Sequence, residues 1–259
     1  FYWAKMLEVS IIKCLMDNYS YLIKDKETNL VGVVDPSEFK AVDMEISRTY
    51  KKLDFILNTH HHFDHIGGNT DLKKKYNSKI IASTYDEKRI PDIDIKKKDG
   101  DFFSIGKTNF KVVHIPGHTL GHICFFSKQS KALFVGDTLF SLGCGRIFEG
   151  TFEQMFKSLE KIKNLPKDTM IYCGHEYTDN NGKFCISIDK ENEKLKDRIK
   201  EVQIKRKRNQ PTLPVSLGQE LDTNIFLRCD DKKIKNNIKM KTNSELEIFT
   251  KLRNLKDKF

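Results

Sequence analysis

The run Thr59–His65 reads T-H-H-H-F-D-H and places four imidazoles and one carboxylate within six residues. It directly follows Leu53–Asn58, an apolar segment typical of a buried β-strand. A lone histidine would most often be structural, but packing does not explain so many metal-binding groups at one strand end. The run therefore constrains the chain to a fold that gathers ligands around a metal centre beside a strand.

The spacing within this run predicts two groups of ligands. His60 and His62 are two residues apart, and alternate residues of an extended segment point the same way, so both can bind one ion. Asp64 and His65 are adjacent, and a helix beginning there would turn them away from the first pair toward a second ion. Imidazole and carboxylate are suitable ligands for zinc, iron or manganese.

Three further segments carry candidate ligands, and each follows an apolar, strand-like run. In I-P-G-H-T-L-G-H, the Pro–Gly turn presents His118 from a loop, and His122 is interpreted as a residue that orients a ligand. In F-V-G-D-T, Asp137 can use both oxygens to bridge two cations. In C-G-H-E-Y, His175 again follows a strand and a glycine. Each segment alone would be unremarkable, but together they predict a dinuclear metal site.

Apolar and alternating runs separated by turn residues predict β-strands in the first two thirds of the chain. These runs are 7–13, 19–24, 30–34, 53–58, 79–82, 102–105, 109–115, 123–127, 132–136 and 169–173. Helices are predicted over 37–52, 69–77, 152–163, 188–208 and 244–255. Ser37 is the expected N-cap of the first helix. The pattern indicates an αβ domain over 6–177 and a helical domain over 178–259.

The composition favours a protein without a membrane-spanning segment, because the longest apolar stretches, such as Ile11–Met16, are too short to cross a bilayer. The six cysteines include no C-x-x-C pair, which favours buried reduced thiols in an intracellular protein. The net charge is +10. Its lysine clusters lie far apart in the sequence and lack interleaved aromatics, so a solvated surface is favoured over a nucleic-acid interface.

Together these motifs resemble the metallo-β-lactamase superfamily, because T-H-H-H-F-D-H is similar to its H-x-H-x-D-H signature and P-G-H-T, G-D-T and G-H-E follow in its order. The closer resemblance is to the glyoxalase II family. It rests on D-N-Y-S-Y at 17–21, F-x-x-G-C-G-R at 140–146, E-G-T at 149–151, C-G-H-E-Y-T at 173–178, N-I-F-L-R at 224–228 and the ending R-N-L-K-D-K-F. The resemblance covers nearly the whole chain. It implies an α/β fold, a four-layer αββα metallo-β-lactamase sandwich with the site at one edge, followed by a helical substrate-binding domain.

The resemblance implies one set of ligands for each ion and one carboxylate that bridges them. The first ion would be held by His60, His62 and His118, the second by Asp64, His65 and His175, and the bridge would be Asp137.

The resemblance also implies a binding site for the glutathione moiety, whose carboxylates suit positive residues and a phenol. The matching positions are Arg146, Phe148, Tyr177, Arg253 and Lys256. Phe148 stands where relatives often have Tyr, so one hydrogen bond to the substrate would be missing. Arg146 stands where Lys is common, which keeps the charge but changes its geometry.

The implied enzyme is a hydroxyacylglutathione hydrolase, a thioester hydrolase that converts S-D-lactoylglutathione to glutathione and D-lactate in the second step of methylglyoxal detoxification. A hydroxide shared by two metal ions would attack the thioester, and Asp64 is the catalytic candidate that would orient it. No Ser or Cys nucleophile is needed, and Cys144 is interpreted as a packing residue. The alternatives are a metal-dependent nuclease, which the positive charge favours, a persulfide dioxygenase with one iron, and a non-catalytic metal-binding protein.

Two divalent ions are expected as cofactors, zinc first, with iron or manganese accepted by the same ligands. The expected partner is a small-molecule glutathione thioester, with no nucleic acid and no membrane, and the expected state is a monomer in the cytoplasm. The chain begins with Phe1 rather than Met, so an organellar form with an upstream targeting segment stays open.

Overall fold

The computed structural model describes residues 6–242 and 244–259, which form two compact units. Unit 1 comprises the chain up to His114 together with Gly121–Gly136, and unit 2 comprises Ile115–Leu120 together with Asp137–Phe259. The predicted domain boundary between residues 177 and 178 lies inside unit 2 and stays a prediction. Among the described residues, no helix combines the length and the apolar character that crossing a membrane requires.

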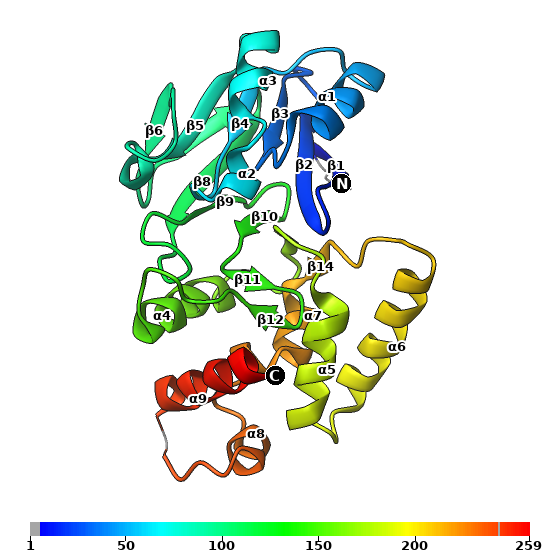
Figure 1. Ribbon diagram of the computed structural model, residues 1–259, viewed down its shortest axis with the longest axis vertical. Coiled ribbons are helices and arrows are strands. Elements are labelled where there is room, and N and C mark those ends of the chain that lie inside the picture. The colour runs from blue at the N-terminus through cyan, green and yellow to red at the C-terminus, as the bar shows by residue number, and fades with distance from the viewer. Residues whose placement is uncertain (1–5, 243) are drawn as a thin grey trace. The chain divides into compact units, whose positions relative to one another are not determined.

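The first sheet of unit 1 has six strands in the order β1-β2-β3-β4-β5-β6 (Figure 1). The strands are β1 (Leu7–Cys14), β2 (Asn18–Asp25), β3 (Val31–Val34), β4 (Phe55–Leu57), β5 (Lys79–Ser83) and β6 (Ile95–Lys97). The first three pair antiparallel, whereas β3 to β6 pair in parallel. Parallel neighbours end at the same edge of a sheet, so the residues that follow β3 and β4 lie together. Asp35 N accordingly donates to Leu57 O at 2.8 Å.

Four antiparallel strands of unit 1 lie next to one another in a second sheet, in the order β10-β9-β8-β7. They are β7 (Phe102–Ile105), β8 (Thr108–His114), β9 (Ile123–Ser127) and β10 (Ala132–Gly136). This sheet faces the first one, since the rings of Tyr21 and Phe134 lie 5.7 Å apart. The near-continuous burial of β9 and β10 agrees with strands that are covered on both faces.

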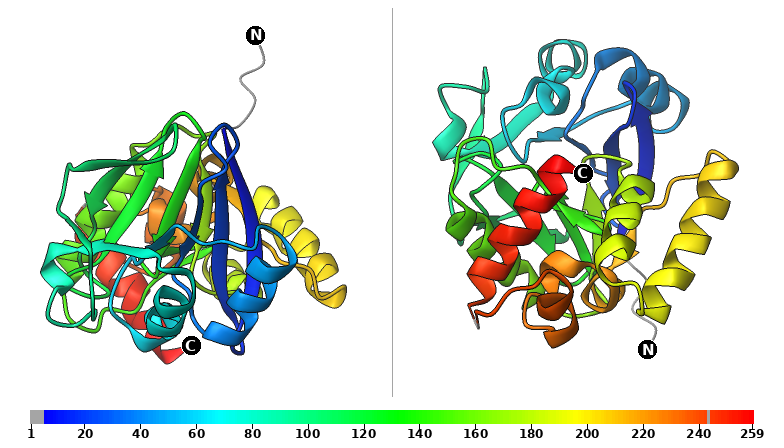
Figure 2. Two further views of the ribbon diagram at one scale, coloured as in Figure 1. Left: turned by 90° about the horizontal axis from the view of Figure 1, so that it is seen from above. Right: turned by 60° about the horizontal axis from the view of Figure 1, so that its bottom comes forward.

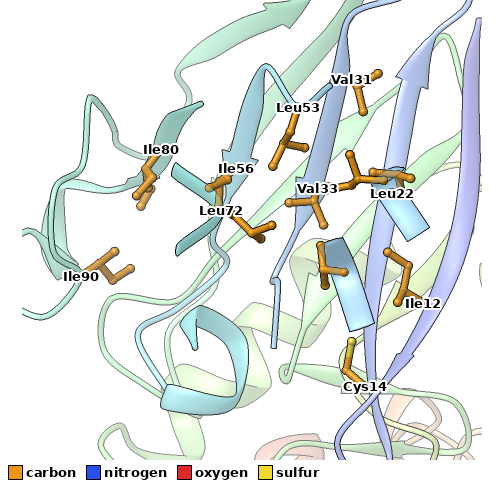
Figure 3. Close-up of a cluster of buried hydrophobic side chains, with 13 residues drawn as sticks. Ile12, Cys14, Leu22, Val31, Val33, Leu53, Ile56, Leu72, Ile80 and Ile90 are labelled. Carbon is orange, nitrogen blue, oxygen red and sulfur yellow. The ribbon is translucent and has the colours of Figure 1, made fainter. Parts of the chain in front are cut away.

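Helices α1 (Phe39–Arg48) and α3 (Asn69–Tyr76) cover the other face of the first sheet. Val42, Ile46 and Leu72 on these helices pack into one buried cluster with strand residues such as Val33 and Ile56 (Figure 3). This cluster holds the parallel strands rigidly, and a rigid sheet edge is what fixed metal ligands require.

The predicted N-cap of the first helix is wrong. The cap residue of α1 is Glu38, without a side-chain capping bond. Ser37 is 2% exposed, and its backbone N donates to Ser20 Oγ at 3.0 Å. Ser37 is therefore anchored to β2, and the helix begins two residues later than expected.

Unit 2 combines short strand pairs with helices. Its elements are β11 (Leu139–Phe140), β12 (Gly143–Cys144), α4 (Phe152–Lys163), β13 (Met170–Cys173), α5 (Thr178–Ile188), α6 (Glu193–Lys207), β14 (Val215–Ser216), α7 (Leu217–Thr223), η2 (Ile225–Leu227), α8 (Lys232–Asn237) and α9 (Glu245–Lys258). β11 pairs with β12, and β13 pairs with β14, both antiparallel.

The single helix predicted over 188–208 forms as α6, whose first residue is Glu193, whereas α5 lies before it and was not predicted. The Asn192 side chain caps α6 by accepting from Leu195 N at 3.1 Å. α5 and α6 then lie side by side (Figure 2), and a Cβ on Gly182 would lie 3.2 Å from Ile199. Residues 189–192 separate the two helices, and the sequence did not reveal this turn because its charged residues are also compatible with a helix.

The last helix forms close to its predicted bounds. Ser244 caps α9 by accepting from Glu247 N at 3.3 Å. Phe249 on this helix packs 5.8 Å from Phe156 of α4 and 6.1 Å from Phe226 of η2. This packing fixes the C-terminal residues Arg253 and Lys256 within unit 2.

Candidate metal centre

In unit 1 the predicted ligands lie on the loop that follows β4 and on the short helix α2 (Phe63–Ile66). His60 Nε2 lies 3.1 Å from His62 Nδ1, so the two rings meet as their spacing predicts. The short helix α2 then turns the chain, and His65 Nε2 lies 3.6 Å from Asp64 Oδ2. His60 and His65 are 0% and 1% exposed, so their rings are held by the fold rather than by solvent.

Asp35, which follows β3, orients these rings from behind. Its Oδ2 lies 3.1 Å from His65 Nδ1 and accepts from Thr59 Oγ1 at 2.7 Å. Thr59 Oγ1 lies in turn 3.0 Å from His60 Nδ1. A carboxylate only accepts, so the proton of His65 sits on Nδ1 and Nε2 is left as the ligand nitrogen. The sequence analysis did not single out Asp35.

His122 and Gly136 close the same part of unit 1. The ring of His122 is fully buried and stacks on His60 with centroids 4.6 Å apart and an interplanar angle of 17°. Gly136 has φ +51°, and a Cβ there would clash with Thr59 and lie 2.8 Å from His122 Cε1. Only glycine therefore fits where β10 ends beside these rings.

In unit 2 the predicted ligands converge on one carboxylate. Asp137 Oδ2 lies 3.2 Å from His175 Nε2 and 3.6 Å from His118 Nε2. All three residues are at most 5% exposed. His118 Nδ1 donates to Arg146 O at 2.7 Å, which leaves Nε2 as the nitrogen that faces Asp137.

The donor atoms suit hard and borderline divalent cations. Each unit brings imidazole nitrogens together with carboxylate oxygens, the set that binds zinc, iron or manganese. Thiolates are not part of it, because all six cysteines are free and buried. Burial also raises the pKa of the Cys144 thiol, so this residue stays protonated and packs, as predicted, rather than acting as a nucleophile.

Two predicted substrate-binding aromatic residues lie against ligands of unit 2. The ring of Tyr177 stacks on His175 at 4.7 Å with an interplanar angle of 6°. Phe148 is 61% exposed, and its ring lies 5.2 Å from that of His118. A substrate bound beside His175 or His118 would therefore lie close to one of these rings.

The three predicted cations of unit 2 differ in their surroundings. The side chain of Arg146 is 60% exposed and its Nε lies 3.4 Å from Asp257 Oδ1. Arg253 is 5% exposed and donates to the same Oδ1 at 2.9 Å and to Cys144 O at 2.8 Å. Lys256 is partly buried, and desolvation together with the charge of Arg253 lowers its pKa. Asp257, which joins the two arginines, was not predicted.

Comparison with known families divides the sequence in two. Residues 16–175 match the metallo-β-lactamase superfamily, and residues 176–259 match the hydroxyacylglutathione hydrolase C-terminus. A hydroxyacylglutathione hydrolase of Pelagibacter ubique is 51% identical over 98% of this chain and 100% of its own. One from a Chelativorans species is 42% identical over 98% of this chain and 99% of its own.

Solved structures are similar in fold at low sequence identity. ETHE1 from Myxococcus xanthus gives a TM-score of 0.69 at 21% identity, over 96% of this chain and 91% of that one. The B3 metallo-β-lactamase BLEG-1 gives 0.66 at 22% identity, over 86% of this chain and 99% of that one. The predicted fold class, a metallo-β-lactamase fold followed by a C-terminal helical region, is thereby confirmed.

Proposed function

The chain belongs to the hydroxyacylglutathione hydrolase family of the metallo-β-lactamase superfamily, and from this premise we propose that it hydrolyses the thioester of S-D-lactoylglutathione. The products are glutathione and D-lactate, which makes the reaction the second step of methylglyoxal detoxification. The observation that carries the proposal is the full ligand set of the family on a chain whose C-terminal region matches the hydrolase family as well.

We propose two divalent ions, zinc first, with one set of ligands each and a shared carboxylate. The first ion would be held by His60, His62 and His118, the second by Asp64, His65 and His175, and Asp137 would be the shared carboxylate. The convergence of ring nitrogens and carboxylate oxygens within each unit supports this assignment. When bound, such a pair of ions acidifies a water and supplies a positive field for a developing oxyanion.

The residues of the chain then orient the reaction. A water oxygen forms a bond to the thioester carbonyl carbon, the C–S bond breaks, and glutathione leaves as a thiolate that takes up a proton. Asp64 is the proposed catalytic residue, because its carboxylate can orient the attacking water beside His65. Arg146, Tyr177 and Lys256 are proposed to bind the glutathione moiety together with Phe148, whose apolar ring lies beside His118.

Arg253 is proposed to belong to the same subsite, and its side chain already has hydrogen-bond partners within the chain. Its guanidinium already donates to Cys144 O and to Asp257. We propose that it holds the segment before Arg146 in place and contributes its charge to the carboxylates of glutathione at short range.

The test is the loss of thioester absorbance with S-D-lactoylglutathione, measured before and after removal of metal by a chelator. Hydrolysis should disappear on chelation and return when zinc is added back. Activity that survives complete metal removal would refute the proposal. Elemental analysis of the purified protein distinguishes zinc from iron and manganese.

We also propose that the protein acts as a monomer in the cytoplasm without a nucleic-acid partner. The support is the wide separation of the lysine clusters along the sequence. Light scattering should give a mass near the 30.2 kDa of the chain. Strong, salt-sensitive RNA binding would contradict the proposal.

A further inference from the structure

Asn18 lies directly behind the proposed catalytic carboxylate. It is the first residue of β2 and is 5% exposed. Its Nδ2 donates to Asp64 Oδ2 at 2.9 Å and to the Asp64 backbone O at 3.0 Å. One buried amide therefore grips both the side chain and the main chain of a residue 46 positions later in the sequence. Asn18 belongs to the D-N-Y-S-Y motif, to which the resemblance assigned no role.

Asp64 needs such a partner more than the other unit 1 ligands do. Its side chain is 38% exposed and it lies in the first turn of a four-residue helix, whereas His65 is 1% exposed. A carboxylate in that position can rotate freely unless something fixes it, and an unfixed ligand loses rotational freedom when an ion binds. The oxygen that Asn18 holds is the same Oδ2 that lies 3.6 Å from His65 Nε2.

The start of β2 also supports His65, the proposed ligand next to Asp64. Ser20 Oγ donates to Asp35 O at 2.7 Å, and Asp35 Oδ2 lies 3.1 Å from His65 Nδ1. Alternate residues of one strand point to the same face, so Asn18 and Ser20 act side by side. Asn18 supports Asp64 directly, and Ser20 supports His65 through Asp35.

We propose that Asn18 is the positioning residue of Asp64 and that its amide maintains affinity for the ion held by Asp64 and His65. The inference rests on the proposed metal-dependent function. Partners behind metal ligands typically change metal affinity about 10- to 100-fold when they are removed. Because Asn18 contacts Asp64 and neither His60 nor His62 in its hydrogen bonds, the loss should fall on one of the two ions.

The test is a calorimetric titration of the metal-free full chain with zinc alone. Wild type should take up two ions. Asn18→Ala, and the nearly isosteric Asn18→Leu, should bind one ion as wild type does and the other about 10- to 100-fold more weakly. Cobalt substitution gives a second readout, because only one set of visible absorption bands should change in the variants.

Asn192→Ala is the matched control. Asn192 Nδ2 donates to Asp189 Oδ2 at 2.8 Å and to Asp222 O at 3.0 Å, so its amide also holds one carboxylate and one main-chain oxygen, and neither partner is a proposed metal ligand. This variant should keep both ions at wild-type affinity.

Two outcomes overturn the inference alone. In the first, both Asn18 variants keep two ions at wild-type affinity; in the second, both ions are lost together with the fold, which would make Asn18 a general packing residue. A wild-type protein that takes up no zinc would instead refute the proposed function.

Discussion

At the scale of single residues, Phe148 and Lys256 of the proposed glutathione site differ in their exposure to solvent. Phe148 presents an exposed ring without a polar atom, 61% accessible to solvent. Lys256 is partly buried, and its Nζ lies over the rings of Phe184 and Phe259, 5.6 Å and 5.4 Å from their centroids. A hydroxyl added to the exposed ring of Phe148 can hydrogen-bond without disturbing the packing. The charge of the desolvated Lys256 ammonium depends on pH.

Replacing Phe148 by Tyr should strengthen substrate binding. A new phenol that hydrogen-bonds the glutathione moiety contributes about 0.5–1.5 kcal/mol, so KM should fall roughly 2- to 12-fold while the melting temperature stays unchanged. Steady-state kinetics of Phe148→Tyr measures this. The matched control is Phe102→Tyr, a similarly exposed phenylalanine (64%) on β7 in unit 1. An unchanged KM in the Phe148 variant would show that the ring does not contact the substrate.

Lys256 should make binding weaken at alkaline pH. Desolvation, followed by the charge of Arg253, lowers the pKa of Lys256 below its ordinary 10.5. Its positive charge is therefore lost at a lower pH than that of an ordinary lysine, and KM should begin to rise below pH 10.5. Lys256→Arg should flatten this rise, since guanidinium stays charged. Lys258→Arg on the same helix is the control, and an equal pH profile in all three proteins would contradict the assignment.

At the scale of elements, the loop between β11 and β12 is held by a carboxylate from α7. Glu220 is fully buried and accepts from Leu142 N, Asn224 Nδ2 and Ser141 Oγ at 2.8–2.9 Å. Leu142 has φ +59°, so this loop adopts a conformation that a leucine takes only when its surroundings fix it. The loop leads directly into Arg146, which links the packing of α7 to the proposed substrate site.

Glu220→Ala should destabilise unit 2 strongly. It leaves the buried donors Leu142 N and Ser141 Oγ without their acceptor, at about 1–3 kcal/mol each, whereas Asn224 Nδ2 keeps other acceptors. Glu220→Gln keeps an oxygen that can accept from Leu142 N and an amide that can donate to Ser141 Oγ, so it should cost less than about 1 kcal/mol. Denaturant unfolding of the two variants measures the difference, and equal losses of unfolding free energy would show that the side chain only fills space.

The same residue predicts a pH dependence. Burial raises the pKa of Glu220 above its ordinary 4.5, so the folded state favours the protonated carboxyl. Its contribution to stability is fully present below about pH 4.5 and is lost as the pH rises through the raised value. The unfolding free energy of wild type should therefore fall relative to that of Glu220→Gln as the pH rises. A constant difference across this range would contradict the shift.

At the scale of the whole molecule, metal binding should raise the free energy of unfolding. Ligands that bind only the folded state add about 2.7 kcal/mol per site at a concentration of 100 Kd. For a chain of this length, that is roughly 5–10 °C in melting temperature for one site. Calorimetry with and without zinc measures the shift. Asp137→Asn removes the proposed bridge and should lose most of it, and a full shift in that variant would contradict the bridging role.

The sequence by itself determined the chemistry. Residue types that bind metal follow strands in the T-H-H-H-F-D-H run and at His118, Asp137 and His175. Within the run, the spacing alone predicts that His60 pairs with His62 and Asp64 with His65. Apart from β6, the strands of unit 1 were also predictable, as was the capped helix α9, because apolar periodicity and capping residues act over a few positions. The helix α5 was not, since Asn180, Asn181 and Gly182 within it are weak helix formers.

The tertiary structure decided which residues stand behind the ligands. Asn18 meets Asp64 across 46 positions, Asp35 meets His65 across 30, and Asp257 joins two arginines that the sequence placed separately. These pairings depend on the register of the β1–β2 hairpin, on the parallel alignment of β3 with β4, and on the packing of α9. The reason is physical: alternation along a strand is set by local geometry, whereas a hydrogen bond between distant segments exists only after the sheet and helices have packed.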